Sequence, residues 1–234
     1  MRPAIDIYLI VDRSSSTKTI IAYINNAIKA VVEKLCNMPE LNGVDKYLSL
    51  IQYNHKADVV LDTVKLETVD LDSIKLVSEG ATDTGAALLK AFELDLKNMR
   101  ERMEDGTEMW RPLFFLFTDG YPDAGKNASE SSIAAVEKKY REAGDKIKEG
   151  EKTRSLVFIA AGFFNEDSDC IIKANLNKLR ELTDNESNVV EVSGGSAEDF
   201  AETFCELIPT GVINSITNGD SAIDFAFFKE KNRK

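Results

Sequence analysis

The sequence predicts a doubly wound α/β fold: a mostly parallel sheet with helices on both faces and one antiparallel edge strand. Apolar runs of four to seven residues alternate with longer segments whose apolar residues recur every three or four positions. The short runs are typical of strands covered on both faces, and the longer segments are typical of amphipathic helices. Because a right-handed crossover packs its helix onto one face of the sheet, this alternation predicts the layered fold.

The first half of the chain predicts the central strand and the edge hairpin. Ile5 to Val11 is almost wholly apolar and ends at Asp12, and the helix that follows has an apolar stripe of Ile20, Ile24, Ile28, Val31 and Leu35. Tyr47 to Tyr53 and Val59 to Val64 then form two strand-like runs, separated only by Asn54 to Asp58. Since this gap is too short for a crossover, we expect an antiparallel hairpin and therefore the antiparallel edge strand.

The second half continues the alternation. Strands are predicted at Pro112 to Phe117, Leu156 to Ala161 and Val189 to Val192. One helix is predicted to begin near Gly85, and one more after each of the three strands. Their apolar stripes, in chain order, are Leu88, Phe92, Leu96, Met99 and Met103; Ile133, Val136, Tyr140, Ala143 and Ile147; Ile172, Leu176, Leu179 and Leu182; and Phe200, Phe204 and Leu207. Pro209 stops the last helix, so we expect one domain over residues 1–210 and a tail over residues 211–234.

Composition narrows the classes of partner and compartment. The chain has 234 residues, 26.0 kDa and 43 % hydrophobic residues, which suits one large α/β domain with a two-sided core. Its formal charge of −11 would repel a phosphate backbone, so nucleic acid is not an expected partner. No segment approaches the roughly 20 apolar residues of a membrane span, and we expect a soluble protein. The chain has an odd number of cysteines, and they are far apart in the sequence: Cys36, Cys170 and Cys205. This pattern favours a reducing compartment over a set of disulfides, so the cytoplasm is the expected location.

Three predicted loops carry hard oxygen ligands at the edge of the sheet. They are Asp12-Arg13-Ser14-Ser15-Ser16, Gly80 to Gly85, and Thr118-Asp119-Gly120. An aspartate with hydroxyls two and four residues later can present three oxygens to one small cation, and such ligands suit Mg²⁺ or Mn²⁺. Ligands of doubly wound sheets lie beyond the carboxyl ends of the strands, which is where two of these loops begin.

The three loops resemble the metal-ion-dependent adhesion site (MIDAS) of the von Willebrand factor A (VWA) superfamily, and the order of elements is similar over residues 4 to 208. Asp12, Ser14 and Ser16 fill the family's D-x-S-x-S motif. Thr82 lies three residues before Gly85, as in the pattern G-G-T-x-x-G, and Asp119 is the aspartate of the T-D-G loop. The departures are Ser15, where the family often has glycine, and Ala81, which replaces the second glycine of G-G-T-x-x-G.

The resemblance implies a role for each of these side chains. Ser14 and Ser16 would bind the ion directly, and Asp12 would accept hydrogen bonds from coordinating waters and serines. Thr82 and Asp119 would exchange direct and water-mediated contact with the ion. Two carboxylates supply only two negative charges, so the metal, Mg²⁺ or Mn²⁺, would remain open to an Asp or Glu carboxylate of a protein partner.

A narrower resemblance concerns two short segments. "LFTDGYPD" and "GATDTGAALLKAF" are similar to bacterial stand-alone VWA proteins of tellurite-resistance (TerY-type) and stress operons, whose neighbours include kinase-like and phosphatase-like proteins. The resulting hypothesis is a metal-dependent adhesion module of a bacterial stress or tellurite-resistance complex. Its partner would be a kinase-like, phosphatase-like or ATPase neighbour, with no role for nucleic acid or membrane.

Several side chains near the three loops keep more than one interpretation. Thr84 competes with Thr82 as a ligand but also fits a helix cap before the glycine. Arg13 could pair with a ligand's carboxylate, pair with Asp123, or face solvent. Asp83 and Asp123 could tune the site or contact a partner, but we expect both to be solvated loop acids.

The main alternative to adhesion is a Mg²⁺-dependent phosphoryl-transfer enzyme or phosphatase of the haloacid dehalogenase kind. That chemistry uses a second aspartate two residues after the nucleophile, and position 14 is Ser14. The single histidine, His55, is predicted in the surface hairpin turn, and no nucleophile elbow, P-loop or dinucleotide motif is present. We therefore expect no enzymatic activity; a scaffold that has lost its metal is a third possibility.

Overall fold

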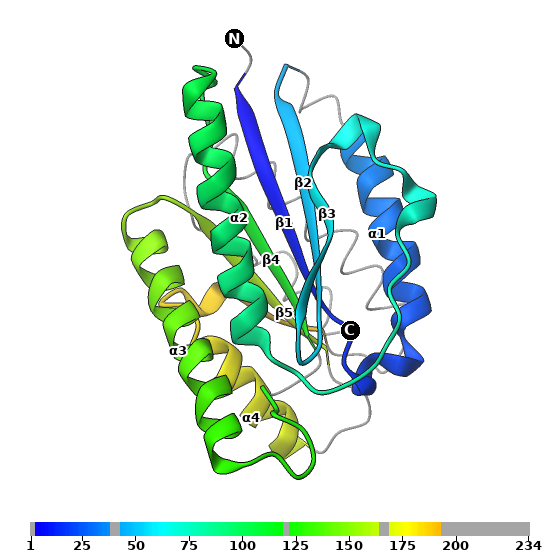
Figure 1. The fold of residues 1–234 in the computed structure, drawn as a ribbon, viewed down its shortest axis with the longest axis vertical. Helices are drawn as coiled ribbons and strands as arrows, with labels where there is room; N and C mark the ends of the chain where they lie inside the picture. Colours follow the sequence, from blue (N-terminus) through cyan, green and yellow to red (C-terminus); the bar gives the residue numbers. More distant parts are fainter. Residues whose placement is uncertain (1–2, 38–42, 119–121, 164–168, 193–234) are drawn as a thin grey trace.

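Six strands form one sheet in the computed structural model, which describes residues 3–37, 43–118, 122–163 and 169–192 (Figure 1). In chain order they are β1 (Ala4–Asp12), β2 (Asp45–Tyr53), β3 (Ala57–Lys65), β4 (Leu113–Thr118), β5 (Val157–Phe163) and β6 (Val189–Val192). Across the sheet the order is β3-β2-β1-β4-β5-β6. Only the β2–β3 pair is antiparallel, which confirms the predicted mostly parallel sheet with an antiparallel edge strand.

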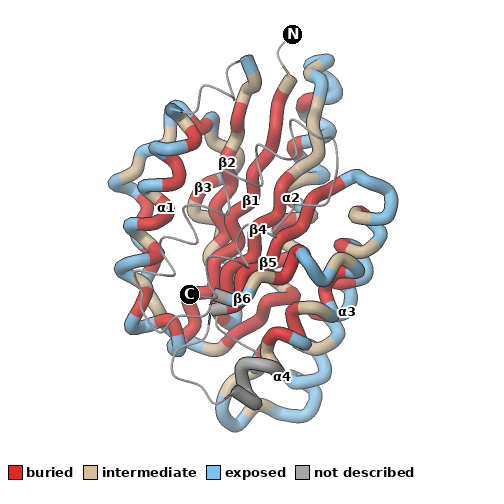
Figure 2. Tube along the Cα trace, turned by 180° about the vertical axis from the view of Figure 1, so that it is seen from behind, coloured by how far each residue is buried: buried red, intermediate tan, exposed pale blue. Residues whose placement is uncertain are grey.

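Helices cover both faces of this sheet, as predicted. The α-helices are α1 (Ile21–Cys36), α2 (Thr84–Glu104), α3 (Glu130–Lys152) and α4 (Asp169–Arg180). Helix α1 packs on one face, and α2, α3 and α4 pack on the other (Figures 1 and 2). None of the helices in the described part of the chain is long and apolar enough to cross a membrane. The predicted last helix, with Phe200, Phe204, Leu207 and Pro209, and the 211–234 tail lie outside the described residues.

Strand β1 is the centre of the core. All nine of its residues are buried, and Figure 2 shows it among other buried strands. Its side chains alternate between the faces, so Ile7 and Leu9 contact the α1 side while Tyr8 and Ile10 contact the side of α2 and α3. Burial on both faces explains why the sequence of this strand is a continuous apolar run rather than an alternation.

The direction of strand connections switches between β1 and β4. From β1 the chain passes through α1 to β2 on one side, whereas β4, β5 and β6 extend the sheet on the other side. Crevices at such switch points, outside the carboxyl ends of the strands, are the usual ligand sites of open α/β sheets. Here the two carboxyl ends are Asp12 and Thr118.

The predicted apolar stripe of α2 is wrong in the C-terminal half of the helix. Leu96, Met99 and Met103 are 45 %, 40 % and 67 % exposed. The residues of this helix that are buried include Leu88, Ala91, Leu94, Asn98 and Arg102. Polar side chains therefore replace apolar ones on the inner face, which a pattern based on apolar residues cannot detect.

A buried polar cluster explains this inversion. Arg102 Nη1 lies 2.7 Å from Asp6 Oδ1 on β1. The Tyr8 hydroxyl donates to Asp95 Oδ1 over 3.3 Å and accepts from Asn98 Nδ2 over 3.0 Å. These side chains interact across the β1–α2 interface, so the helix presents polar residues to the sheet.

The two carboxyls of this cluster have raised pKa values. Burial raises the pKa of Asp6 from 3.8 to about 6, although Arg102 opposes the shift. Burial, followed by the charge of Asp6, raises the pKa of Asp95 from 3.8 to about 6. A raised pKa in the folded state means that folding favours the protonated carboxyl. Each ionised carboxylate therefore destabilises the fold above pH 6, and this penalty disappears as the pH falls towards 4.

We predict that Asp95→Asn stabilises the protein at pH 7 by about 1 kcal/mol or more, because it removes a half-buried charge. The gain over the wild type should shrink at pH 5, where the wild-type carboxyl is largely protonated in the fold. Thermal unfolding at both pH values measures this difference. Glu93→Gln, an exposed change on the same helix, is the matched control and should show no such dependence. A gain from Asp95→Asn that is equal at both pH values would contradict the prediction.

Candidate functional site

The site is built around the buried carboxylate of Asp12, the last residue of β1. Asp12 is 1 % exposed. Its Oδ1 accepts the backbone N–H of Ser14 over 2.8 Å, and its Oδ2 accepts the hydroxyl of Thr118 over 2.7 Å. Since Thr118 is the last residue of β4, the second bond joins the carboxyl ends of the two strands at the switch point.

Burial determines the protonation behaviour of Asp12. Burial raises its pKa, and hydrogen bonds from Ser14, Thr118 and Tyr53 oppose the rise. In the described part of the chain, no lysine or arginine forms an ion pair with this carboxylate. A buried carboxylate that has hydrogen bonds but no counter-charge is an environment that a bound cation would stabilise.

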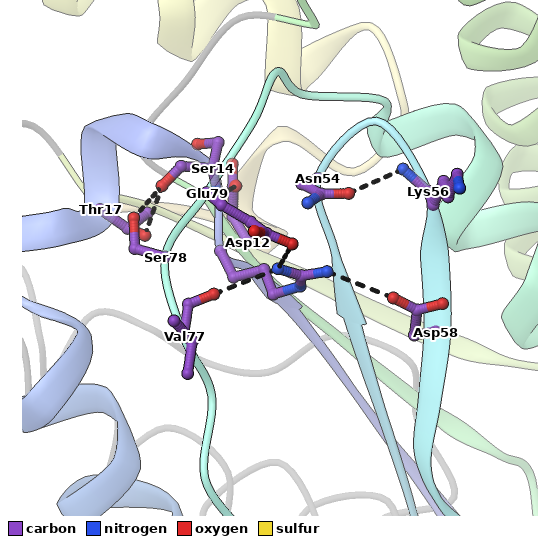
Figure 3. Close-up of polar contacts among 10 residues, drawn as sticks. Asp12, Ser14, Thr17, Asn54, Lys56, Asp58, Val77, Ser78 and Glu79 are labelled. Carbon is purple, nitrogen blue, oxygen red and sulfur yellow. Dashed lines mark hydrogen bonds and ion pairs between the residues drawn. The ribbon is translucent and has the colours of Figure 1, made fainter.

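Two serine hydroxyls lie together beside Asp12. Ser14 Oγ and Ser16 Oγ are 2.9 Å apart, with Ser14 buried and Ser16 exposed. The chain curls after β1 into the 3₁₀ helix η1 (Ser15–Thr19), which brings these two alternate side chains together. The carbonyl of Ser14 accepts the hydroxyls of Thr17, over 2.9 Å, and Ser78, over 2.5 Å, so the turn is held from both sides (Figure 3).

A second loop runs alongside the first and carries Thr82. The backbone N–H of Ser15 donates to the carbonyl of Gly80 over 3.0 Å, which joins the two loops. Thr82 is 6 % exposed and exchanges two backbone hydrogen bonds with Asp123, of 3.0 and 2.8 Å. The loop of Thr82 therefore lies between the loop after β1 and the segment after β4.

Thr84 and Asp83 do not occupy the positions predicted for them. Asp83, not Thr84, is the N-cap of α2, since its carboxylate accepts the N–H of Ala86 over 3.0 Å. Asp83 is buried and forms a 2.6 Å ion pair with Lys139, so its interpretation as a solvated loop acid is wrong. The hydroxyl of Thr84 lies 3.4 Å from the Tyr53 hydroxyl. An aspartate at an N-cap accepts hydrogen bonds from the free N–H groups of the first turn, which explains why Asp83 caps the helix in place of Thr84.

Gly85 has a packing role in the same motif. A Cβ at this position would collide with the backbone of Lys139 and Tyr140 in α3. The glycine therefore permits α2 to approach α3 closely, and this contact places Lys139 beside Asp83.

Arg13 is neither solvent-facing nor paired with Asp123, so both of these expectations are wrong. Its side chain is 9 % exposed, and its guanidinium lies 2.8 Å from Glu79 Oε1 and 3.3 Å from Asp58 Oδ2. Nη1 also donates to the carbonyl of Val77 over 3.2 Å. The side chain thus ties the loop after β1 to the β3 edge of the sheet and to the loop that leads to Thr82. The pKa of Glu79 is lowered by its hydrogen bond with Arg13 and by the charge of the guanidinium.

Asp119, the fifth predicted ligand, lies outside the described residues, directly after Thr118 in the sequence. Of the other predicted ligands, Asp12, Ser14 and Ser16 form one hydrogen-bonded group, and Thr82 lies on the adjoining loop. Within the described part of the chain, no group of three or more histidine, cysteine, aspartate or glutamate side chains is arranged to hold a metal. Any cation bound here would therefore depend on hydroxyl oxygens as well as carboxylates, and the donor set fits a hard divalent ion.

Two residues support the site through hydrogen bonds that the sequence analysis did not predict. Tyr53 and Thr118 both hydrogen-bond to Asp12 from neighbouring strands. Their positions at the ends of predicted strands were the available signal, but the partner of each hydroxyl depends on strand order. The prediction that His55 lies in a surface turn is confirmed, since this side chain is exposed in the β2–β3 turn. Trp110 lies half-buried at the edge of the core.

The fold and the site together define a class of protein. The chain belongs to the von Willebrand factor type A domain family, whose sequence profile matches residues 6–202. No curated protein was matched by sequence.

Solved structures share this fold at low sequence identity. A pilus adhesin, SpaC from Lactobacillus rhamnosus GG, has a TM-score of 0.63 and 14 % identity over 92 % of this chain and 31 % of its own. The PilB minor pilin from Streptococcus sanguinis has a TM-score of 0.59 and 13 % identity over 88 % and 61 %. Proximal thread matrix protein 1 from the mussel byssus, with a zinc-occupied MIDAS motif, has a TM-score of 0.52 and 15 % identity over 87 % and 44 %. The chain thus spans less than two thirds of each, and the likeness shows the fold alone.

We predict that Thr118→Val lowers the free energy of unfolding by about 1–3 kcal/mol, because it leaves an oxygen of the buried Asp12 carboxylate without its donor. Urea unfolding of the metal-free protein measures the change. Thr118→Ser is the matched variant, since it keeps the hydroxyl and loses a methyl group. Valine keeps the shape of threonine, so it would be the milder change if packing alone determined stability. A Thr118→Val protein that is more stable than the Thr118→Ser protein would refute the prediction.

Proposed function

We propose that this chain is a protein-binding module that depends on a divalent cation, Mg²⁺ or Mn²⁺, held by Asp12, Ser14, Ser16, Thr82 and Asp119. In this proposal residues 1–210 form the binding domain and residues 211–234 are a tail. Membership of the von Willebrand factor type A domain family supports the general class.

One observation carries the proposal. The Asp12 carboxylate is buried without an ion pair among the described residues, directly beside two hydroxyls whose oxygens are 2.9 Å apart. Burying a carboxylate without a counter-charge costs free energy, and a bound cation can offset this cost. A hard cation between Asp12, Ser14 and Ser16 would do so.

The chain's own residues hold this arrangement in place. The Ser14 N–H and the Thr118 hydroxyl fix the two oxygens of Asp12, and η1 presents the serine hydroxyls. Arg13 stabilises the loop after β1 through ion pairs with Asp58 and Glu79. When bound, the cation would supply a positive centre with only two carboxylates of this chain around it, able to accept an anionic oxygen from outside.

We propose that an Asp or Glu carboxylate of a protein partner supplies that oxygen. The names of the pilus adhesin and the minor pilin fit such a role, and the zinc-occupied MIDAS of the mussel protein fits divalent-metal binding by this fold. We further propose a bacterial cytoplasmic setting, in a stress or tellurite-resistance complex with a kinase-like, phosphatase-like or ATPase partner. The resemblance of residues 80–92 and 116–123 and the odd cysteine count support this setting.

The second candidate, phosphoryl transfer with Asp12 as nucleophile, has less support. Both oxygens of Asp12 accept hydrogen bonds inside the protein, and the neighbouring position that would hold an acid/base carboxyl is a serine hydroxyl. Hydrolysis of p-nitrophenyl phosphate that requires Mg²⁺ and is lost in Asp12→Asn would overturn the binding assignment.

We predict that Mg²⁺ and Mn²⁺ raise the melting temperature of the wild-type protein, because they bind the folded state alone. At a hundred times the dissociation constant the stabilisation should be about 2.7 kcal/mol. The double variant Ser14→Ala, Ser16→Ala should lose this response while its metal-free circular dichroism stays that of the wild type.

The control is Ser15→Ala, an exposed change in the same loop that leaves the paired hydroxyls intact. It should keep the metal response of the wild type. Equal metal stabilisation of the wild type and the double variant would refute the ligand assignment.

We also predict that acetate, as a minimal carboxylate, binds the Mn²⁺-loaded protein and lowers the relaxation rate of water protons by displacing a coordinated water. Acetamide, which has the same shape without the charge, should be at least tenfold weaker. The Ser14→Ala, Ser16→Ala variant corrects for acetate binding to free Mn²⁺. A response to acetate that matches acetamide would contradict the proposed open position.

A further inference from the structure

A cavity of about 860 Å³ lies at the end of the sheet opposite to Asp12. Its walls come from α2, α3 and the segments that lead into β4 and β5. Asp6, near the amino end of β1, lies at its inner wall, six positions before Asp12 on the same strand. The cavity is thus separate from the candidate metal site, and its volume is in the range of small-molecule pockets.

The walls of this cavity are largely apolar. The apolar and aromatic lining side chains are Phe92, Met99, Met109, Trp110, Pro112 and Leu156. Met99 is one of the exposed apolar residues in the C-terminal half of α2, and it forms part of the cavity wall. Methionine side chains adapt to the shape of apolar groups, and the faces of aromatic rings attract cations through the ring quadrupole.

A buried carboxylate without a hydrogen-bond donor lies at the inner wall of the cavity. The side chain of Asp6 is 3 % exposed, and Arg102 lies 2.7 Å from its Oδ1. Its Oδ2 is buried and accepts no hydrogen bond from any described residue. Asp95 lines the same cavity with a carboxylate that accepts only the Tyr8 hydroxyl, over 3.3 Å, among the described side chains. An unpaired carboxylate oxygen in an apolar wall is costly unless a ligand donates to it.

The charge of the lining is also one-sided. Besides Asp6 and Asp95, the lining includes three further acids, Glu142, Asp145 and Glu149, against the two cations Arg111 and Lys146. Even with Arg102 counted beside Asp6, acids outnumber cations. Such an excess in a concave, low-dielectric surface attracts positive ligands and disfavours anions.

We propose that this cavity binds an organic amine, in which an aromatic or aliphatic body packs against the apolar walls and a protonated amino group pairs with the carboxylate of Asp95. The ammonium group donates to Asp95 and adds positive charge near the buried carboxylate of Asp6, and the hydrocarbon body replaces water on the apolar walls. The site is independent of the proposed metal-dependent function, because none of its residues belongs to the three loops around Asp12.

Trp110 allows a direct test, since it is the only tryptophan of the chain and lines the cavity. Its emission is followed while 4-phenylbutylamine is added, and calorimetry gives the affinity independently. The amine should bind saturably, uncharged 4-phenylbutanol at least tenfold more weakly, and anionic 4-phenylbutyrate not at all. Equal affinity for the amine and the alcohol, or no saturable binding of the amine by either method, would overturn the proposal.

Variants locate the ammonium group. Asp95→Asn should weaken amine binding at least tenfold and leave the alcohol unchanged, whereas Glu93→Gln, an exposed acid of the same helix, should bind the amine as the wild type does. Ser14→Ala, Ser16→Ala should also bind it normally, which separates this test from the metal proposal. Full amine affinity in Asp95→Asn would refute the assigned site.

Discussion

The structure depends on one buried carboxylate. Asp12 ends the central strand, and its two oxygens hold the turn that follows β1 and the end of β4. Through these bonds the loops around the switch point acquire a fixed geometry before any ligand binds. This arrangement leaves the Asp12 carboxylate without an ion pair among the described residues, and burial raises the pKa of this carboxylate. Because the buried charge lowers the stability of the fold, a bound cation should raise that stability strongly.

Strand β1 carries an aspartate near each end, and the protein treats the two in different ways. At the carboxyl end Asp12 is held by N–H and hydroxyl donors, with the exposed side chain of Ser16 nearby. Near the amino end Asp6 is paired with Arg102, which also stacks 3.6 Å from the ring centre of Tyr47. Among the described residues Asp12 forms no ion pair, whereas Asp6 pairs with Arg102. The same residue type therefore serves the loops of the candidate metal site at one end of the strand and a polar cluster under α2 at the other.

The accuracy of the sequence predictions differed between backbone and side chains. The positions of the strands along the chain, the edge hairpin and the position of α2 were predictable, because burial on two faces imposes apolar runs and helical periodicity. The inner face of α2 was predicted wrongly, because Asn98 and Arg102 are buried through contacts with residues about 90 positions earlier in the chain. Arg13 and Asp83 were misjudged for the same reason: their partners, Glu79 and Lys139, come from distant segments.

The sequence by itself determined the α/β layering and the candidate site residues Asp12, Ser14, Ser16 and Thr82, since strand ends and loop motifs are local features. Only the tertiary structure decided that the Thr118 hydroxyl donates to Asp12 and that Arg13 pairs with Asp58 and Glu79. Tertiary structure also formed the amine cavity, from side chains of two helices and two strand entries. The physical reason is range: periodicity and turn chemistry act over a few residues, whereas charge pairing and cavities arise between segments that meet only in the fold.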